Sequence, residues 1–388
     1  MRYTVNDMIY RTLGNTGLRV SEIGIGTEHL DGKPYEVVEE VIQAALSHGI
    51  NMMDLFMPGE TVRRHIGRAM KGRRQDFYIQ GAVGSVDLRE QYDISRDLDT
   101  CKRYLEGLLK ALDTDYIDFG MFFFMDTQEA LDQIQKNGIV DYVRDLKRQG
   151  VVRHIGATSH NPLIARKMAE MGLLETLMFS VNPAFDMNPG TATLDNMLVE
   201  MGDHRLEGVD PDRAALYLLC EKMGIGITSM KTLGAGKLLS PEHTPFKAPL
   251  SLGQCIHYAL SRPAVASVML GYTSAKQVEE ACAYPEMSEA EKDYTGITGG
   301  YTGLMRGACV YCNHCLPCPA GIDIASVNRY LDIARLDREN VPPSVRQHYD
   351  TLKAGGGSCI SCGSCEERCP FDVRVISNMA EAAEVFGR

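Results

Sequence analysis

Residues 9–20, Ile-Tyr-Arg-Thr-Leu-Gly-Asn-Thr-Gly-Leu-Arg-Val, begin the pattern that decides the fold. The Gly14-Asn15 pair is a strong turn signal between two short runs that favour strands, so this stretch is predicted to form a β-hairpin. After it, apolar runs typical of buried strands alternate with segments of helical periodicity. The expected strands are 22–26, 51–54, 76–80, 117–123, 153–157, 177–181, 225–229 and 266–270, and the expected helices are 35–48, 60–71, 97–112, 128–148, 161–172, 211–223, 251–261 and 274–283. Eight strand–helix repeats predict an α/β fold, a closed (β/α)8 TIM barrel.

The chain of 388 residues is long enough for such a barrel and a second, smaller domain. We expect the barrel over 1–285, a glycine-rich linker over 286–304 and a small, mainly helical, two-cluster ferredoxin-like domain over 305–388. Helices of the small domain are predicted at about 323–337, 343–353 and 373–385. A long segment at about 183–210 interrupts the sixth repeat, and it is interpreted either as a lid or partner-binding element or as a solvated insertion.

Two cysteine runs near the C-terminus predict the cofactor of the small domain. They are Cys309, Cys312, Cys315 and Cys318 before Pro319, and Cys359, Cys362, Cys365 and Cys369 before Pro370. Three thiolates spaced by two residues can surround one cluster face, and the cysteine before proline reaches the other cluster. The spacing therefore predicts two [4Fe-4S] clusters, the first three cysteines of each run sharing a cluster with the last cysteine of the other run.

Two other uses of these cysteines fit less well. A zinc ribbon needs only two C-x2-C pairs for each metal, which is fewer cysteines than the two runs supply. Disulfides are disfavoured because the cysteines are crowded and no signal peptide opens the sequence. The first run has two residues rather than three before Cys318, so the cluster that this cysteine ligates stays open.

Composition excludes several classes of partner. Lys and Arg total 40 against 51 Asp and Glu, and this net charge of −11 argues against nucleic acid as a ligand. No apolar run approaches the roughly 20 residues of a membrane span. We therefore expect a cytoplasmic protein, and the oxygen sensitivity common to exposed clusters indicates a reducing, anaerobic cytosol.

The catalytic residues of a TIM barrel lie where strands lead into the following loops. Several polar residues stand at such positions, and four of them are predicted to be catalytic: His29, Asp54, His160 and Lys231. Glu28, which also follows the first strand, is another candidate for a substitute acid. A histidine with a pKa near 6.5 can supply a proton at neutral pH. The alternative for each histidine is an ordinary loop or capping role, and for Asp54 it is a capping or pocket carboxylate.

Motifs spread along the chain resemble those of the aldo/keto reductase superfamily, here followed by a C-terminal 4Fe-4S ferredoxin-type domain. The matching stretches are Tyr10-Arg-Thr-Leu-Gly-Asn-Thr-Gly17, Gly24-Ile-Gly-Thr27, Asp115-Tyr-Ile-Asp118, Gly156-Ala-Thr-Ser159, Met230-Lys-Thr-Leu-Gly-Ala-Gly-Lys237 and Gln277-Val-Glu-Glu280. The resemblance implies NAD(P)H-dependent carbonyl reduction by a tetrad of Asp, Tyr, Lys and His.

Most of that tetrad is missing from this chain. Asp54 is retained, but the segment 54–59 has no tyrosine, alanine or glycine near Ala82 replaces the lysine, and Phe123 replaces the histidine. Losing one general acid costs on the order of 10²–10⁴ in rate. Standard carbonyl reduction is therefore not expected, and whether the barrel catalyses another reaction stays open.

The resemblance also implies a nucleotide site. Ser159 and Asn161 stand where the family contacts the nicotinamide amide, the segment 230–237 matches the pyrophosphate side, and the segment 271–280 matches the adenosine end. The implied cofactor-binding residues are Ser159, Asn161, Met230, Lys231, Gly234, Gly236, Lys237, Gly271, Lys276 and Glu280. Lys276 can hold a 2′-phosphate as a point charge, and the choice between NADP and NAD stays open.

These observations favour an iron–sulfur oxidoreductase that couples a small-molecule or NAD(P)H site in the barrel to electron transfer through two clusters. Its expected partners are a redox protein or a small-molecule substrate. The alternative is a non-catalytic electron-transfer or scaffold subunit whose barrel docks a redox partner, which the apolar run 122–124 favours. A third possibility is that the clusters are purely structural.

Overall fold

The computed structural model describes residues 8–88, 91–186, 209–294, 297, 307, 309, 315–336, 338–339, 341, 343–369 and 372–388. The chain divides into two units, one of residues 1–90 and 94–301 and the other of residues 91–93 and 302–388.

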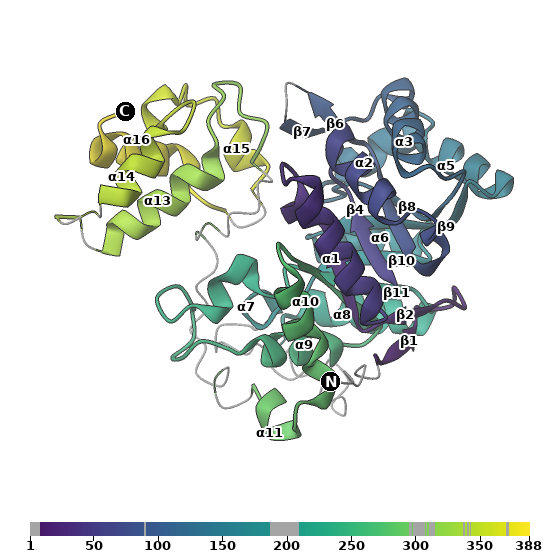
Figure 1. Cartoon of the computed structure of the whole chain (residues 1–388). Coiled ribbons are helices and arrows are strands. Elements are labelled where there is room, and N and C mark those ends of the chain that lie inside the picture. Colours follow the sequence, from purple (N-terminus) through teal and green to yellow (C-terminus); the bar gives the residue numbers. More distant parts are fainter. Residues whose placement is uncertain are drawn as a thin grey trace. The chain divides into compact units, whose positions relative to one another are not determined.

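Eight parallel strands close into a barrel in the larger unit, as predicted (Figure 1). Hydrogen bonds join them in the order β10-β11-β12-β3-β4-β5-β8-β9, and β9 pairs with β10 to complete the ring. The strands are β3 (Ile23–Gly26), β4 (Met52–Leu55), β5 (Tyr78–Val83), β8 (Ile117–Phe122), β9 (Val152–Ser159), β10 (Thr176–Ser180), β11 (Gly226–Met230) and β12 (Val265–Gly271). The surrounding helices are α1 (Tyr35–Ser47), α2 (Glu60–Ala69), α3 (Leu98–Leu112), α4 (Gln128–Lys136), α5 (Ile139–Gln149), α6 (Pro162–Glu170), α8 (Pro211–Met223), α9 (Leu252–Leu260) and α10 (Ala275–Cys282).

Strands and helices of the barrel follow directly from their residues. Every side chain of β4 and of β8 is buried, which is why these strands are continuous apolar runs rather than alternating ones. Helix α3 begins where the Asp97 side chain accepts a hydrogen bond from the Thr100 backbone N–H at 2.8 Å. It buries a stripe that includes Leu105, Leu108 and Leu112.

Two details of the predicted secondary structure were wrong. The single helix expected over 128–148 is two helices, α4 and α5, because Gly138 between them has a φ of +75° and cannot continue a right-handed helix. A second hairpin, β6 (Ser85–Leu88) and β7 (Gln91–Ile94), was not expected.

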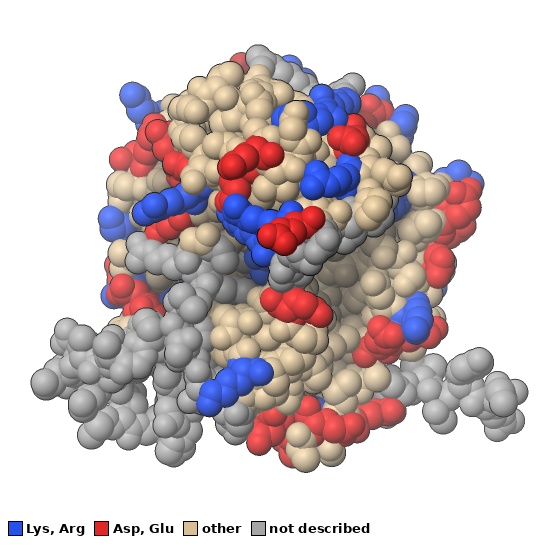
Figure 2. All heavy atoms as spheres, turned by 90° about the vertical axis from the view of Figure 1, so that its left-hand side faces the viewer, with Lys and Arg blue, Asp and Glu red and all other residues tan. Residues whose placement is uncertain are grey.

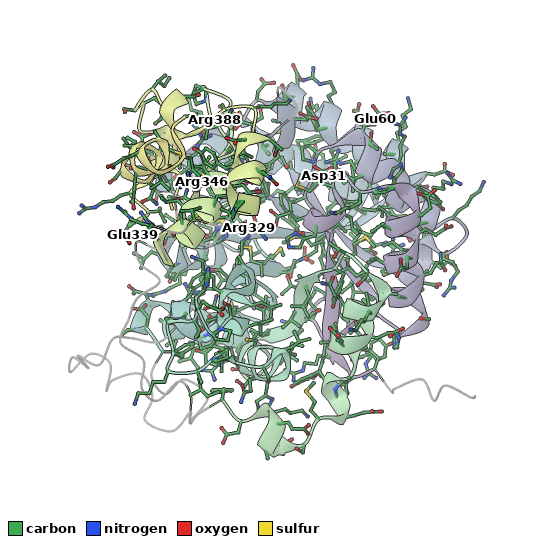
Figure 3. All side chains as sticks on the ribbon, turned by 60° about the vertical axis from the view of Figure 1, so that its left-hand side comes forward. Asp31, Glu60, Arg329, Glu339, Arg346 and Arg388 are labelled. Carbon is green, nitrogen blue, oxygen red and sulfur yellow. The ribbon has the colours of Figure 1, made fainter. Side chains whose placement is uncertain are left out.

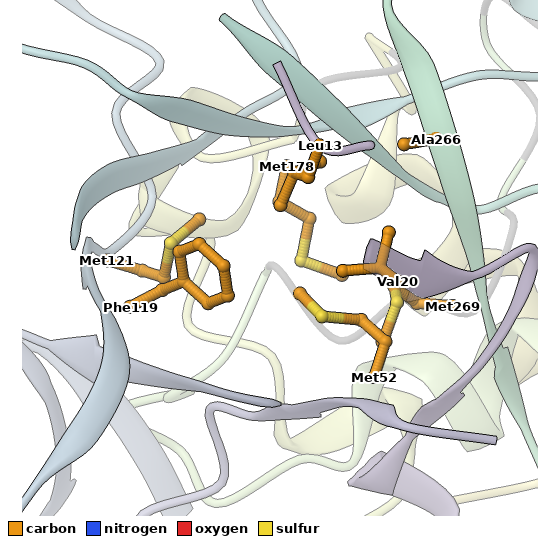
Figure 4. Close-up of a cluster of buried hydrophobic side chains, with 8 residues drawn as sticks. All are labelled: Leu13, Val20, Met52, Phe119, Met121, Met178, Ala266 and Met269. Atoms are coloured by element: carbon orange, nitrogen blue, oxygen red, sulfur yellow. The ribbon is translucent and has the colours of Figure 1, made fainter. Parts of the chain in front are cut away.

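The predicted N-terminal hairpin closes the amino-terminal end of the barrel. Its strands β1 (Tyr10–Thr12) and β2 (Arg19–Ser21) pair antiparallel. Gly14 has a φ of +50°, and a Cβ there would lie 2.3 Å from the carbonyl oxygen of Gly224, so only glycine fits. The barrel interior beside the hairpin is packed with apolar side chains (Figure 4), namely Leu13, Val20, Met52, Phe119, Met121, Met178, Ala266 and Met269. A packed amino-terminal end leaves the opposite end for chemistry.

Shorter elements lie between the barrel repeats. They are the 3-10 helices η1 (Thr27–Leu30), η2 (Arg74–Asp76), η5 (Gly234–Leu239) and η6 (Tyr284–Glu286), and the helices α7 (Pro183–Asp186) and α11 (Glu289–Lys292). The predicted lid or insertion at 183–210 lies mostly outside the described residues, and so does the later part of the predicted linker at 286–304. The described ends of the first segment are joined, because the Asp210 N–H donates to the carbonyl of Asp186.

The smaller unit is mainly helical, as predicted. Arg346 and Arg388, labelled in Figure 3, donate to backbone carbonyls at the ends of α16 and α14, at 2.9 and 2.6 Å. Tyr349 stacks on Phe386 with ring centroids 4.1 Å apart. The elements are α13 (Ile324–Leu336), α14 (Pro343–Asp350), η7 (Gly356–Ser358), α15 (Ser364–Glu367) and α16 (Val375–Phe386). These contacts hold α16 against α14.

Charged side chains of both signs are interspersed on the face drawn in Figure 2. Such mixing gives that face no strong field of one sign. Among the residues that the structure describes, no helix has the length and apolar character that crossing a membrane requires.

Candidate active site and cluster site

The Asp54 carboxyl is a buried acid at the carboxyl end of β4. The residue is 3% exposed, and its backbone carbonyl accepts a hydrogen bond from the Thr27 hydroxyl at 2.8 Å, which ties β4 to the start of η1. Burial and the negative charge of Glu28 raise the pKa of Asp54 to about 7, while Lys231 acts in the opposite direction. A carboxyl with this pKa can both donate and accept a proton near neutral pH.

Glu28 and Lys231 form a weak ion pair next to this acid. The Lys231 Nζ lies 4.0 Å from the Glu28 Oε2, and both side chains are largely buried. Lys231 follows β11 with a φ of +59°, and the Asn182 side chain donates to its carbonyl at 2.9 Å. A left-handed conformation is uncommon for a residue other than glycine and is typical of functional sites. The structure therefore brings the predicted residues Asp54 and Lys231 together and adds Glu28 to them.

His160 forms a buried pair with Asp126. The His160 Nδ1 lies 2.9 Å from the Asp126 Oδ2, and the His160 backbone N–H donates to the other carboxylate oxygen at 2.6 Å. Burial by itself would raise the pKa of Asp126, but the charge and hydrogen bonds of His160 and the Ser159 hydroxyl outweigh it and lower that pKa. A carboxylate bound to one ring nitrogen fixes the orientation of the imidazole, as in catalytic His–Asp pairs.

Ser159 and Asn161, which are predicted to contact the nicotinamide amide, use their side chains for hydrogen bonds within the chain. The Ser159 hydroxyl donates to the carbonyl of Met125 at 2.7 Å and to Asp126 at 3.0 Å. The Asn161 side-chain oxygen caps α6 by accepting from the Leu163 N–H at 2.9 Å. These bonds use most of the hydrogen-bonding capacity that a nucleotide would need.

Phenylalanine rings occupy the region where the family would have its histidine. Phe56 and Phe123 stack with centroids 5.4 Å apart, and Phe124 packs against His160 at 5.6 Å. Phe124 has a φ of +55°, and the half-buried Arg96 guanidinium donates to its carbonyl at 3.0 Å. The wall of the site formed by β4 and β8 is therefore aromatic and apolar.

His29 lies at the rim of the barrel. Its side chain is exposed, and it packs so closely on Gly271 at the end of β12 that a Cβ there would lie 2.1 Å from the His29 Cδ2. Both residues were predicted to be site residues, and the structure places them against each other at the surface. A ligand that reached the Gly271 backbone would have to displace this ring.

The segment predicted to bind the pyrophosphate is a tight turn. Met230 packs against the apolar interior of the barrel, and Lys237 is only 7% exposed. Gly234 and Gly236 have positive φ, and their backbone N–H groups donate to carbonyls of the same turn at 2.9 Å. The turn therefore uses its own amide donors internally.

The residues predicted for the adenosine end pair with each other. Lys276 and Glu280 form an i,i+4 ion pair at 3.7 Å, and the lysine side chain is 82% exposed. The first backbone N–H of α10, that of Ala275, donates to the Glu40 carboxylate of α1 at 3.0 Å. A carboxylate already lies where the start of this helix would attract a phosphate.

A hollow in the smaller unit gathers cysteines from both runs. It is lined by Cys318 together with Cys359, Cys362 and Cys365. Cys369 is described but does not line this hollow. This set is the one that crossed ligation predicts for one of the two clusters.

The local hydrogen bonding of the hollow favours a thiolate ligand at Cys359. Ser361 has a φ of +53°, and its backbone N–H donates to the Cys359 Sγ at 3.4 Å, a contact that favours a thiolate. Among the described residues, no three His, Cys, Asp or Glu side chains converge tightly enough for a single metal ion. A cubane takes one thiolate on each of its four irons, so its ligands stand farther apart than those of one ion.

The other predicted ligand set is only partly described. Cys309 and Cys369 are half-buried and Cys315 is buried, whereas Cys312 lies outside the described residues. The Arg368 guanidinium donates to the Cys315 carbonyl at 3.0 Å, so the two runs are held side by side. The remaining cysteines, at 101, 220, 255 and 282, are buried in the barrel unit.

Sequence reasoning did not assign a role to Asp126 or Arg368. Asp126 follows β8 and His160 follows β9, and these strands are neighbours in the barrel. Their side chains could have been paired from the predicted strand order alone. Arg368 carried no such signal, because only the folded loops show which carbonyls its side chain reaches.

Comparisons with known proteins agree with the two units. The aldo/keto reductase family model matches residues 22–250, and the 4Fe-4S dicluster domain model matches residues 308–380. The uncharacterized oxidoreductase YqkF of Bacillus subtilis is 26% identical over 289 residues, covering 70% of this chain and 89% of the relative. L-galactose dehydrogenase of Arabidopsis thaliana is 26% identical over 305 residues, covering 70% and 86%.

A solved structure shares the barrel. The aldo-keto reductase AKR11C1 from Bacillus halodurans, in its holo form, superposes with a TM-score of 0.57 at 22% identity, covering 74% of this chain and 94% of the other. This likeness shows the fold, and the family model covers more than half of the chain. The protein therefore belongs to the aldo/keto reductase family of oxidoreductases and carries a C-terminal 4Fe-4S dicluster domain.

Proposed function

We propose that this protein is an iron–sulfur oxidoreductase whose barrel exchanges protons and electrons with a small molecule, while two [4Fe-4S] clusters carry the electrons to or from a redox partner. The observation that carries the proposal is the buried Asp54 carboxyl with its pKa of about 7 beside the Glu28–Lys231 pair. A barrel that lacks the tyrosine of its family still holds a group able to move a proton at neutral pH.

The proton chemistry is assigned to residues of this chain. Asp54 in its protonated form donates to the oxygen or carbon that becomes negative as the substrate is reduced, and the Lys231 cation stabilises the carboxylate that remains. In the oxidative direction the same carboxylate accepts the proton. The His160–Asp126 pair is the second proton-transfer group, and the rings of Phe56 and Phe123 provide an apolar surface that lowers the local dielectric.

The number of electrons matches two clusters. Reduction or oxidation of a carbonyl or a comparable small molecule transfers two electrons, and each cubane carries one. The proposed ligand sets are Cys318 with Cys359, Cys362 and Cys365, which the hollow supports, and Cys369 with Cys309, Cys312 and Cys315.

A nicotinamide nucleotide is the candidate partner of the barrel because the family uses such nucleotides. The Lys276–Glu280 pair and the Glu40 carboxylate at α10 weaken the case for a bound 2′-phosphate. We therefore propose NADH rather than NADPH as the nucleotide that exchanges electrons with the barrel.

An anaerobic titration of the full chain tests the proposal. The oxidised protein is titrated with NADH and then with NADPH, and cluster absorbance and EPR are recorded. Cluster reduction by either nucleotide supports a working redox site in the barrel. If neither nucleotide reduces the clusters while dithionite still reduces two, the nucleotide is removed from the proposal. The protein is then an enzyme or electron carrier that receives its electrons from a partner protein.

The second candidate function is an electron-transfer subunit whose barrel only docks a partner. The stacked Phe56 and Phe123 favour it, since they make the region of the missing histidine apolar. Replacing Asp54 with asparagine distinguishes the two candidate functions. An electron carrier should transfer electrons from dithionite to a protein acceptor as fast in this variant as in the wild type, whereas the enzyme should lose turnover of its small molecule.

A further inference from the structure

Asn182 is a fully buried residue that follows β10 and joins two segments of the barrel mouth. Its Nδ2 donates to the backbone carbonyl of Lys231, after the neighbouring strand β11, at 2.9 Å. Its Oδ1 accepts a hydrogen bond from the Phe185 backbone N–H in α7 at 3.0 Å. One side chain therefore links the loop after β11 to the short helix after β10.

Helix α7 is itself anchored to the helices around the barrel. Its last residue, Asp186, pairs with Arg213 of α8 at 2.5 Å. The same carboxylate accepts hydrogen bonds from the hydroxyls of Tyr217 and Tyr258, at 2.8 and 3.3 Å, and all three of these side chains are fully buried. A buried carboxylate with three donors holds α7 in one position. The Asn182 amide at its start is therefore fixed as well.

The carbonyl that Asn182 binds belongs to a residue in an uncommon conformation. Lys231 has a φ of +59°, which costs free energy for any residue other than glycine. The Gly234 N–H also donates to this carbonyl, at 2.9 Å, but that bond lies within the turn, whereas the Asn182 amide comes from a neighbouring strand. Relaxation of Lys231 to a right-handed conformation would change its φ by about 120° and redirect its side chain.

We propose that Asn182 is a positioning residue: by holding the Lys231 carbonyl, it keeps the Lys231 ammonium beside Asp54. The inference rests on the proposed function, in which Asp54 moves the proton. The Lys231 Nζ lies 4.0 Å from the Glu28 Oε2, which is the upper limit for an ion pair, so a small displacement of the lysine separates the two charges. Without Asn182 the lysine backbone relaxes, and its ammonium moves away from both carboxyl groups.

The role of Asn182 can be measured at Asp54, because two charged side chains act on that carboxyl. Glu28 raises the pKa of Asp54, and the Lys231 cation lowers it. Moving the cation away removes its effect, so the pKa of Asp54 should rise above the wild-type value. An asparagine that only stabilised the fold would change the free energy of unfolding and leave this pKa where it is.

An infrared pH titration of the anaerobically purified full chain measures the pKa. The carbonyl stretch of protonated Asp54 is the band that disappears in Asp54→Asn. The test variants are Asn182→Ala, Lys231→Met and the double variant. Asn51→Ala is the matched control, because the Asn51 side chain also accepts from one backbone N–H, at 2.7 Å, and donates to one backbone carbonyl, at 2.9 Å, but at the amino-terminal end of the barrel.

Asn182→Ala should raise the pKa of Asp54 by about as much as Lys231→Met does. The double variant should have the same pKa as Lys231→Met, because Asn182 has no cation to position once the lysine is gone. Asn51→Ala should leave the pKa at the wild-type value. Mass spectrometry should also find that an amine reagent modifies Lys231 faster in Asn182→Ala than in the wild type.

An unchanged pKa of Asp54 in Asn182→Ala would overturn the inference. Additive shifts in the double variant would overturn it too, since Asn182 would then act on Asp54 without Lys231. If Asn182→Ala does not fold, Asn182→Ser decides by the same titration, because its hydroxyl can still accept from α7 but is too short to hold the Lys231 carbonyl. A wild-type Asp54 that ionises near its ordinary pKa contradicts the proposed function itself, which is a different outcome.

Discussion

Replacing Asp54 with asparagine should stabilise the protein, and the gain should increase with pH. In the folded state the pKa of Asp54 is about 7, above its ordinary value of 3.8, because burial opposes ionisation. The unfolded chain ionises this group near the ordinary value. The wild type therefore loses stability as the pH rises from about 4 to 7, and the cost is fully present above pH 7. Asparagine cannot ionise, so the variant escapes this loss.

The magnitude follows from the two pKa values. A difference of about three units at 1.36 kcal/mol for each unit gives a gain of up to about 4 kcal/mol at pH 8. At pH 5.5 the folded carboxyl is still protonated and the gain is about half as large, so the difference between variant and wild type should grow by about 2 kcal/mol between pH 5.5 and 8. Relaxation of the protein around the ionised Asp54 carboxylate lowers the free-energy cost of burying it. Both gains in stability then become smaller in proportion.

Urea unfolding under anaerobic conditions measures this difference. Circular dichroism follows the helices of both units, and cluster absorbance follows the smaller unit alone, so the transition of the larger unit can be told apart. Asp126→Asn is the control, for which the stability should change in the opposite direction. The reason is that the pKa of that buried aspartate is lowered in the folded state. It should reduce stability at every pH of the series. A gain for Asp54→Asn that is constant from pH 5.5 to 8, or a loss that grows with pH, would refute the reasoning.

Three further predictions concern the barrel, the nucleotide and the metal. Asp186→Asn removes the carboxylate that pairs with the buried Arg213 at 2.5 Å, and it should cost about 3–5 kcal/mol, seen as a lower urea midpoint of the barrel transition. Lys276→Ala should change the Kd for NADPH by less than about threefold, since an exposed lysine paired with Glu280 contributes little; a tenfold loss in calorimetry would contradict this. Removing iron with a chelator should unfold the smaller unit and leave the thermal transition of the barrel in place, and a simultaneous loss of both would contradict the division into two units.

The barrel could be predicted because each of its strands is a short apolar run whose limits depend on local residues. The run at 51–54 became β4 with a shift of one residue, since both faces of that strand are covered. The second hairpin could not be found in this way. Ser85–Leu88 and Gln91–Ile94 are short, and the two residues between them include neither glycine nor asparagine, which mark most tight hairpins.

The candidate site was predicted only where a strand end identified it. Asp54 ends a predicted strand, and His160 and Lys231 each follow one, so their places in the barrel could be read from the sequence. The pairing of Lys231 with Glu28 and the pKa of Asp54 depend on closure of the barrel, which brings together residues that are up to about 200 positions apart. Distances and burial of that kind come only from the folded chain.

Backbone conformation at the mouth of the barrel argues for a working site rather than a relic. Lys231 and Phe124 are both left-handed, and each such residue costs on the order of 1 kcal/mol that a barrel used only for docking could recover by relaxing. Neither is free to relax. Asn182 holds the carbonyl of Lys231, while Arg96 holds the carbonyl of Phe124 and the Thr158 hydroxyl accepts from its N–H at 2.7 Å. Buried polar groups that maintain strain at two strand ends are what a site with a fixed geometry requires, and the loss of three tetrad residues has not removed them.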